Sequence, residues 1–264
     1  MDGAPSLPDG LPPGRWVTPD PTFAEDGAVT GSVLWVSDHP VPAAGQQWRR
    51  LMAVHPDTGL WPLLLTGLYS DPNRPWHTGE LEPVALPGTD AASADRVLAR
   101  LWNSAFGGTP EDFDWGADEP SPAGPWPGLA AATTTLAGDP DGEAGALALE
   151  LGGAGDRMIG LVPAGSGGAA LVGCGWLGAV NHASVADIAV IVGSWEERFG
   201  ARLVGVGFDT LDLSVAAPPT TPAAALSVAA EHYAFCPDNI GGAEQLDEYA
   251  GALVGCRHWG FWWD

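Results

Sequence analysis

The chain has 264 residues and carries 33 acidic against 10 basic side chains, a formal net charge of −23. All the basic residues are arginines, and without a lysine ammonium a Walker-A phosphate loop, a lysine Schiff base and a kinase-type lysine are excluded. The negative charge repels a phosphate backbone and an anionic membrane surface, so we expect no binding to nucleic acid or to membranes.

The composition favours long loops around a sizeable core, since glycine and proline provide 37 and 25 residues and charged residues only 16% of the chain. No basic residue precedes Arg15 and no apolar run follows the first methionine, which is unlike a signal peptide. The longest nearly apolar run, residues 167–180, is too short to span a bilayer. Three widely spaced cysteines do not make a disulfide framework. We therefore expect a cytoplasmic protein.

The first half of the chain is predicted to be rich in loops, with residues 1–28 irregular and residues 29–110 forming an α+β region. Its expected elements are a strand at 32–37, a hairpin with arms 50–54 and 60–65 around the turn Pro56-Asp57-Thr58-Gly59, and one helix at 89–106. Pro62 favours an edge position for the second arm, because proline cannot donate to a ladder. Residues 111–130 are acidic and rich in Pro and Gly, which is typical of a linker.

The second half, residues 131–264, is predicted to be a domain in which helices pack on a sheet. Ser184 followed by Asp187 starts a helix that stops at Gly200, and Thr221 followed by Pro222 starts a second one. A third helix is expected to carry Leu246, Tyr249, Ala250 and Leu253 and to end at Gly255. Strands are expected at 157–163, 169–172, 202–208, 211–215 and 257–263. The last strand has aromatic residues on both faces, which favours a central place in the sheet. The order of elements indicates an α/β or α+β fold with a mixed sheet.

Two glycine motifs have a catalytic or nucleotide-binding alternative to a plain loop. Residues 173–178 match G-x-G-x-x-G, yet the next predicted helix starts near Ser184, too late to receive a pyrophosphate. Ser166 lies in a glycine run similar to a nucleophile elbow, with Asp209 and histidines later in the chain. An elbow leads directly into a helix, whereas a strand is predicted to follow Ser166. A glycine-rich loop is the preferred interpretation of both.

Polar residues near the C-terminus provide the candidate site. The first group follows a predicted helix and could line a polar pocket: His232, Cys236, Asp238 and Asn239. A second group offers weak candidates for zinc ligands: His232, Cys236, Cys256 and His258. The first two are one helical turn apart and the last two share one strand face, so the four side chains could converge on a metal ion. No C-x-x-C pair is present and free cysteines are commonly buried, so core packing is the simpler interpretation and no metal or cofactor is predicted.

Four runs in the last third of the chain carry a family resemblance. They are residues 194–202 (SWEERFGAR), 207–211 (GFDTL), 230–240 (AEHYAFCPDNI) and 261–264 (FWWD). Together they resemble the domain-of-unknown-function family 4253, over about residues 155–264. This family is common in high-GC actinobacteria, which agrees with the lysine-free composition. It has no established activity or catalytic residues, so the resemblance implies no function for any position.

The function favoured by these observations is a non-catalytic interaction module, immunity-like or accessory in role, that binds a basic protein. The large negative charge steers such a partner, and the acidic cluster between Glu111 and Glu119 offers it a face. The alternative is an enzyme-like domain that binds a small molecule or a metal around His232, Cys236 and Asp238. The oligomeric state does not follow from the sequence.

Overall fold

The computed structural model describes residues 5–23, 31–88, 90–106, 124–132, 138–242 and 245–264. Within these residues seven strands form one sheet, and seven α-helices and two short 3₁₀ turns surround it. The strands are β1 (Gly14–Val17), β2 (Leu34–Ser37), β3 (Leu60–Leu65), β4 (Met158–Pro163), β5 (Ala201–Val206), β6 (Thr210–Val215) and β7 (His258–Trp262). The helices are α1 (Ala44–Thr58), α2 (Ala91–Phe106), α3 (Pro140–Leu151), α4 (Gly167–Cys174), α5 (Val185–Phe199), α6 (Pro222–Phe235) and α7 (Leu246–Leu253), with turns η1 (Gly152–Ala154) and η2 (Pro237–Asn239).

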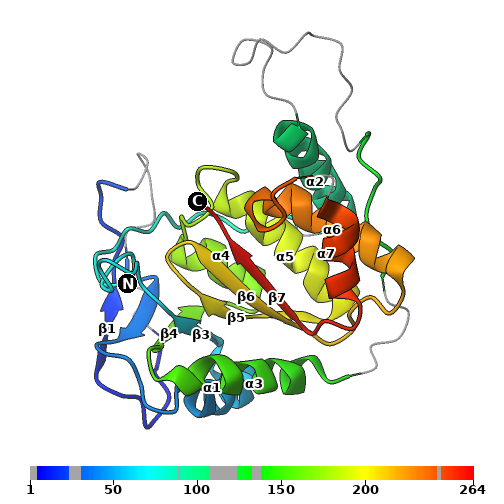
Figure 1. The fold of residues 1–264 in the computed structure, drawn as a ribbon. Coiled ribbons are helices and arrows are strands. Elements are labelled where there is room, and N and C mark those ends of the chain that lie inside the picture. Colours follow the sequence, from blue (N-terminus) through cyan, green and yellow to red (C-terminus); the bar gives the residue numbers. More distant parts are fainter. Residues whose placement is uncertain (1–4, 24–30, 89, 107–123, 133–137, 243–244) are drawn as a thin grey trace.

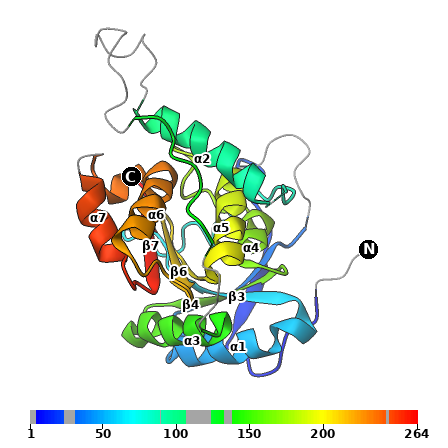
Figure 2. The same ribbon diagram turned by 90° about the vertical axis from the view of Figure 1, so that its right-hand side faces the viewer.

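The sheet has the strand order β1-β2-β4-β3-β5-β6-β7 and separates two layers of helices. β3 and β5 run parallel, and the other neighbouring pairs run antiparallel. Helices α1 and α3 cover one face, and α4, α5 and α6 cover the other, with α2 and α7 packed outside them (Figures 1 and 2). The predicted α+β class with a mixed sheet is confirmed, and the N-terminal region contains an antiparallel strand pair, β1–β2, and the predicted helix α2, although that pair is not the one predicted at residues 50–65.

Helix α5 starts and stops, and helix α6 starts, at the predicted residues, because the caps are local. Ser184 accepts a hydrogen bond from the Asp187 amide at 3.2 Å, and Gly200 ends α5 in the left-handed conformation at φ 61°. Thr221 accepts from the Ala224 amide at 3.3 Å at the start of α6. Most of the second half of α6 is buried, as expected for a helix between two layers.

The predicted hairpin at residues 50–65 is wrong in its first arm, because residues 50–54 belong to helix α1. Ala44, Trp48, Leu51 and Met52 recur at helical spacing and bury one face of α1. Gly59 is the C-cap of this helix, with φ 65° and its amide donating to the His55 carbonyl. The same Pro-Asp-Thr-Gly sequence that suggests a β-turn therefore ends a helix.

The predicted strand at residues 169–172 is also wrong, because these residues lie in helix α4. Ser166 caps α4, accepting from the Ala169 amide at 3.2 Å. Gly168 lets α4 approach α5 closely, since a β-carbon there would lie 2.8 Å from the Ala189 carbonyl oxygen. Close packing between α4 and α5 thus outweighs the low helix propensity of glycine.

Two strands occupy other positions in the sheet than the sequence predicts. β3 is central, not an edge strand: it pairs with β4 along its length, but with β5 only at Leu64 and Leu65, so Pro62 leaves the parallel ladder intact. β7 is an edge strand, not a central one, since β6 is its single neighbour among the strands of the described residues. Trp259 and Phe261 on one face of β7 are buried, whereas Trp262 on the other face is 46% exposed.

The predicted boundaries at residues 28 and 111–130 fall largely outside the described residues. The strands that precede residue 111 share one sheet with the strands that follow residue 130. How the chain divides into domains stays a prediction.

Candidate functional site

His232, the first candidate site residue, lies inside the core on α6. It is fully buried among the rings of Trp195, Trp259 and Phe261, with ring centroids 4.5–5.1 Å apart. Its Nδ1 is 3.0 Å from the Tyr249 hydroxyl, and its Nε2 has no hydrogen-bond partner within the described chain. Burial lowers the pKa of His232 to about 3, so the ring is neutral at physiological pH.

Cys236, Asp238 and Asn239 come together at β7 and bind the backbone of this strand or of the residues that follow it. The Cys236 thiol donates to the Trp262 carbonyl at 2.9 Å, and Asp238 accepts from the Asp264 amide at 3.1 Å. Asn239 donates to the Gly260 carbonyl at 2.7 Å and accepts from the Trp262 amide at 3.1 Å.

These three side chains thus form a clamp on the edge strand. Burial raises the pKa of Cys236 to about 12, which keeps the thiol protonated.

The four candidate zinc ligands are held by separate partners. The Cys256 thiol donates to the His258 carbonyl at 3.0 Å, and His258 Nε2 lies 2.9 Å from an oxygen of Asp212. His232 and Cys236 have the contacts given above. Among the described residues no three His, Cys, Asp or Glu side chains gather in a way that could hold a metal ion.

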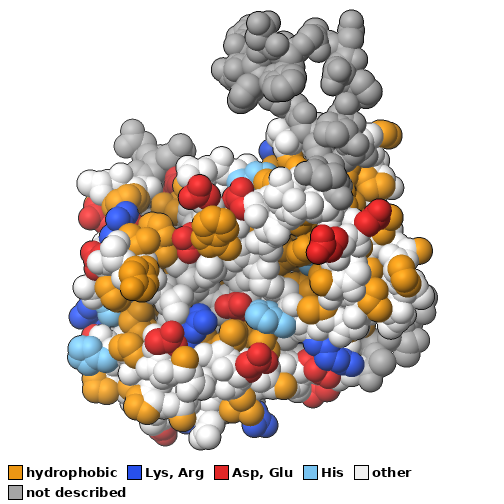
Figure 3. Space-filling model, in the orientation of Figure 1, with side chains coloured by type: hydrophobic (Ala, Val, Ile, Leu, Met, Phe, Trp, Pro, Cys, Tyr) orange, Lys and Arg blue, Asp and Glu red, His pale blue; other side chains and the backbone are white. Residues whose placement is uncertain are grey.

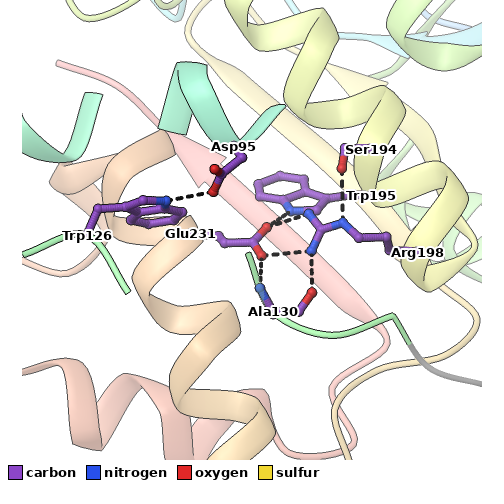
Figure 4. Close-up of polar contacts among 7 residues, drawn as sticks. All are labelled: Asp95, Trp126, Ala130, Ser194, Trp195, Arg198 and Glu231. Atoms are coloured by element: carbon purple, nitrogen blue, oxygen red, sulfur yellow. Dashed lines mark hydrogen bonds and ion pairs between the residues drawn. The ribbon is translucent and has the colours of Figure 1, made fainter. Parts of the chain in front are cut away.

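Sequence reasoning missed a buried ion pair between Arg198 of α5 and Glu231 of α6 (Figure 4). The guanidinium donates to both carboxylate oxygens, at 2.7 and 2.6 Å, and Trp195 Nε1 donates to the second oxygen at 2.7 Å. The Ala130 amide donates to Glu231 at 2.6 Å, and the Ala130 carbonyl accepts from Arg198 at 2.9 Å. Because Glu231 is fully buried and each oxygen has two donors, this network stabilises the packing of three segments and is closed to substrate. A lone carboxylate in an apolar helix was the signal in the sequence.

The two glycine motifs take helix-terminal roles. Gly175 ends α4 at φ 78°, so residues 173–178 close a helix instead of opening one toward a phosphate. Ser166 does lead directly into a helix, contrary to the prediction. Its backbone is extended, at φ −154°, and its hydroxyl serves as the N-cap, which lacks the strain of a nucleophile elbow.

A cavity of about 580 Å³ lies at the edge of the sheet where β3, β5 and β7 have their carboxyl ends. The turn after β5 provides Phe208 and Asp209, and the residues after β7 provide Trp263 and Asp264. The segment after β3 contributes Glu80, and the connection between α4 and α5 contributes further walls. In open α/β sheets ligands commonly bind outside the carboxyl ends of parallel strands, and β3, β5 and β7 point the same way here, so this cavity is the candidate site.

Tryptophan packing supports the cavity from beneath. Trp176 Nε1 donates to the Gly207 carbonyl at 2.9 Å, and the rings of Trp176 and Trp263 cross at 67° with centroids 5.5 Å apart. Gly178 is required beside them, because a β-carbon there would collide with the Trp176 ring and the Phe208 carbonyl oxygen. The cavity therefore rests on fixed side chains and has a defined shape.

The walls combine apolar surface with carboxylates. Leu177, Val180 and Phe208 are apolar, and Glu80, Asp209 and Asp264 are the acidic side chains. Glu80 is paired with Arg74 through two hydrogen bonds, which hold its pKa below the usual range.

Asp209 has no side-chain partner among the described residues, and no basic side chain lines the cavity there. Acidic and hydrophobic side chains lie together on the face in Figure 3, near the position that Figure 1 marks as the C-terminus.

The second part of this α+β chain resembles a known family. Residues 158–264 match the family model described as Domain of unknown function (DUF4253), which confirms the resemblance in the sequence. No curated protein and no solved structure matches the chain. None of the helices in the described ranges is both long enough and apolar enough to cross a bilayer.

Proposed function

We propose that this protein is a non-catalytic interaction module that binds a basic partner protein in the cytoplasm, in an accessory or immunity-like role. The observation that carries the proposal is that most of the positive side chains are neutralised within the protein, whereas most of the carboxylates in the described residues are not. Seven of the arginines form ion pairs with carboxylates of the same chain: Arg15, Arg74, Arg100, Arg157, Arg198, Arg202 and Arg257. The unpaired charge is therefore almost entirely negative, and its field attracts a basic protein from a distance.

The cavity at the carboxyl edge of the sheet offers a contact point for that partner. Its unpaired carboxylates, Asp209 and Asp264, lie beside hydrophobic side chains that face solvent: Val180 is 64% exposed and Phe23 is 41% exposed. A patch of exposed hydrophobic groups with charged groups at its rim is the usual composition of a protein interface. This combination favours a specific contact over general charge attraction.

The enzyme-like alternative around His232, Cys236 and Asp238 has less support from the geometry. A general base or a nucleophile must reach substrate and must ionise near neutral pH. His232 is sealed in the core, and the Cys236 thiol is held in its protonated form and directed at a backbone carbonyl. The role of these residues in chemistry stays a prediction.

Salt dependence tests the proposal. The protein is immobilised, partners are captured from an extract of the source cells, and the Kd of the purified partner is measured by biolayer interferometry. We expect the Kd to rise at least about tenfold between about 50 and 300 mM salt, because screening weakens attraction between exposed charges. A Kd that does not change with ionic strength would refute the electrostatic proposal.

A matched pair of variants distinguishes the contribution of the cavity carboxylates to partner binding from the contribution of the overall charge. Asp209→Asn/Asp264→Asn removes two charges at the cavity, and Asp57→Asn/Glu150→Gln removes two from the exposed surface of α1 and α3. We expect the first pair to weaken partner binding more than the second. Equal losses would mean that the partner contacts another face.

A further inference from the structure

The geometry points to an arginine side chain of the partner as the group that enters the cavity, an inference that rests on the proposed function. The carboxylates around the cavity favour the binding of a cation. Asp209 and Asp264 lie in the cavity wall, and two further carboxylates lie close to it. Asp238 accepts a hydrogen bond from the Asp264 amide, and the negative charge of Asp20 is near enough to Glu80 to oppose its ionisation. These groups leave a local excess of negative charge at a partly enclosed surface, where an incoming cation loses less to solvent screening.

Arg74 is the basic side chain beside the cavity, and its charge is already matched. It donates to the two oxygens of Glu80 at 2.7 and 2.8 Å, and these hydrogen bonds raise its pKa above the usual value. Asp209 and Asp264 are therefore the carboxylates left for a ligand. A guanidinium can donate hydrogen bonds to a carboxylate along its edge while its face stays free.

Aromatic walls favour a guanidinium over an ammonium. A guanidinium is planar and weakly hydrated, so it can lie against an aromatic face, whereas the lysine ammonium keeps its water. The protein itself shows this arrangement, since the Arg74 guanidinium lies 5.3 Å from the centroid of the Phe208 ring while it pairs with Glu80. In the cavity wall the exposed ring of Phe23 offers comparable surface to a second guanidinium, whereas the Phe208 ring already has Arg74 over it.

A neighbouring cavity indicates a peptide as the source of the guanidinium. This second cavity has a volume of about 310 Å³, is lined mainly by alanine, valine and Trp176, and shares Leu177 and Val180 with the first. A free amidine or guanidine would leave it empty. A partner chain that places arginine in the acidic cavity can place a nearby apolar side chain here, because an extended chain advances about 3.3 Å per residue and the two cavities share wall residues.

Benzamidine tests the cavity without the unknown partner. It joins an aromatic ring to a planar cation, and benzamide is its neutral isostere. By ligand-detected NMR titration we expect benzamidine to bind in the millimolar range, ~1–10 mM, and benzamide at least about tenfold more weakly. Equal binding of both, or no binding of benzamidine up to about 10 mM, would overturn the inference.

The variants and a peptide pair complete the test. Asp209→Asn/Asp264→Asn should weaken benzamidine at least about tenfold, and Asp57→Asn/Glu150→Gln should leave it unchanged within about twofold. A Gly-Arg-Leu peptide with blocked ends should bind more tightly than its citrulline counterpart. If benzamidine binds and the arginine peptide does not, the occupant is a free organic cation and the assignment to a partner arginine is wrong. Salt-dependent capture of a partner can fail or succeed independently of these results, so the two proposals are distinguishable.

Discussion

Replacing Glu196 with glutamine should change how the stability of the protein depends on pH. Glu196 lies on α5, and its carboxylate accepts a hydrogen bond from the Gly167 amide at the start of α4, at 2.8 Å. Burial raises the pKa of Glu196 from 4.5 to about 7, and the hydrogen bond from Gly167 and the charge of Arg202 only partly oppose this effect. Near neutral pH the protein therefore holds a carboxyl group that resists ionisation.

The sign follows from comparing the folded and unfolded chains. Because the folded pKa is higher, the folded state binds the proton more tightly, and this contribution to stability is fully present below about pH 4.5. It is lost as the pH rises through about 7. A difference of about 2.5 pKa units corresponds to roughly 3 kcal/mol, and solvent near the partly exposed carboxylate reduces the expected effect to about 2 kcal/mol.

The Glu196→Gln variant keeps an oxygen that accepts from Gly167 and removes the charge. We expect its free energy of unfolding to exceed that of the wild type by about 2 kcal/mol near pH 8, and the excess to disappear near pH 4.5. Urea unfolding followed by tryptophan fluorescence at several pH values measures the difference. A difference that stays constant across this range would show that the reasoning about Glu196 is wrong.

Two controls make the comparison specific. His232 acts in the opposite direction, since its pKa falls to about 3 on folding and its contribution is lost as the pH drops from about 6.5. The wild type and the variant both contain His232, so its effect cancels in their difference. Glu197→Gln removes a neighbouring exposed charge and should show no comparable change with pH.

Three further substitutions test packing and pairing. Glu231→Gln should lower the free energy of unfolding by about 3 to 5 kcal/mol, because Arg198 stays buried without its counter-charge; a loss under about 1 kcal/mol in urea unfolding would contradict the buried pair. Asn239→Asp keeps the acceptor for β7 but loses the amide donor, and should cost about 1 to 2 kcal/mol and speed hydrogen exchange in β7; unchanged exchange would argue against the clamp. Gly45→Ala places a β-carbon against the backbone of α3 and should lower the Tm, whereas Gly153→Ala, which faces open space, should not; equal Tm values would show that the two helices can separate at no cost.

Local signals allowed the sequence to predict helices α5 and α6. Their caps, Ser184 and Thr221, lie within three residues of the groups that they bind. The turn ending at Gly59 failed as a predictor because a β-turn and a helix C-cap both use a glycine that follows polar residues. Helix α4 was missed because its small residues show no period, and their packing against α5 is a tertiary effect.

The candidate site was harder to predict than the fold. Glu80, Asp209 and Asp264 lie far apart in the chain, and they meet only because β3, β5 and β7 point in one direction. No spacing rule connects such residues before the strand order is known. By contrast, the polar cluster from His232 to Asn239 is compact in the sequence, yet its members mostly bind backbone groups of β7.

The place of β3 has a consequence for relatives that carry the family segment. The matched residues begin at β4, but β4 is bonded to β2 and β3, and β5 reaches β4 only across β3. In a chain reduced to the matched residues, β4 would have no strand beside it in the sheet and would not contact the β5–β7 meander. The backbone amides and carbonyls on both edges of β4 would then be unpaired. Any relative with this strand order must therefore supply a substitute for β3, from its own preceding sequence or from a second polypeptide.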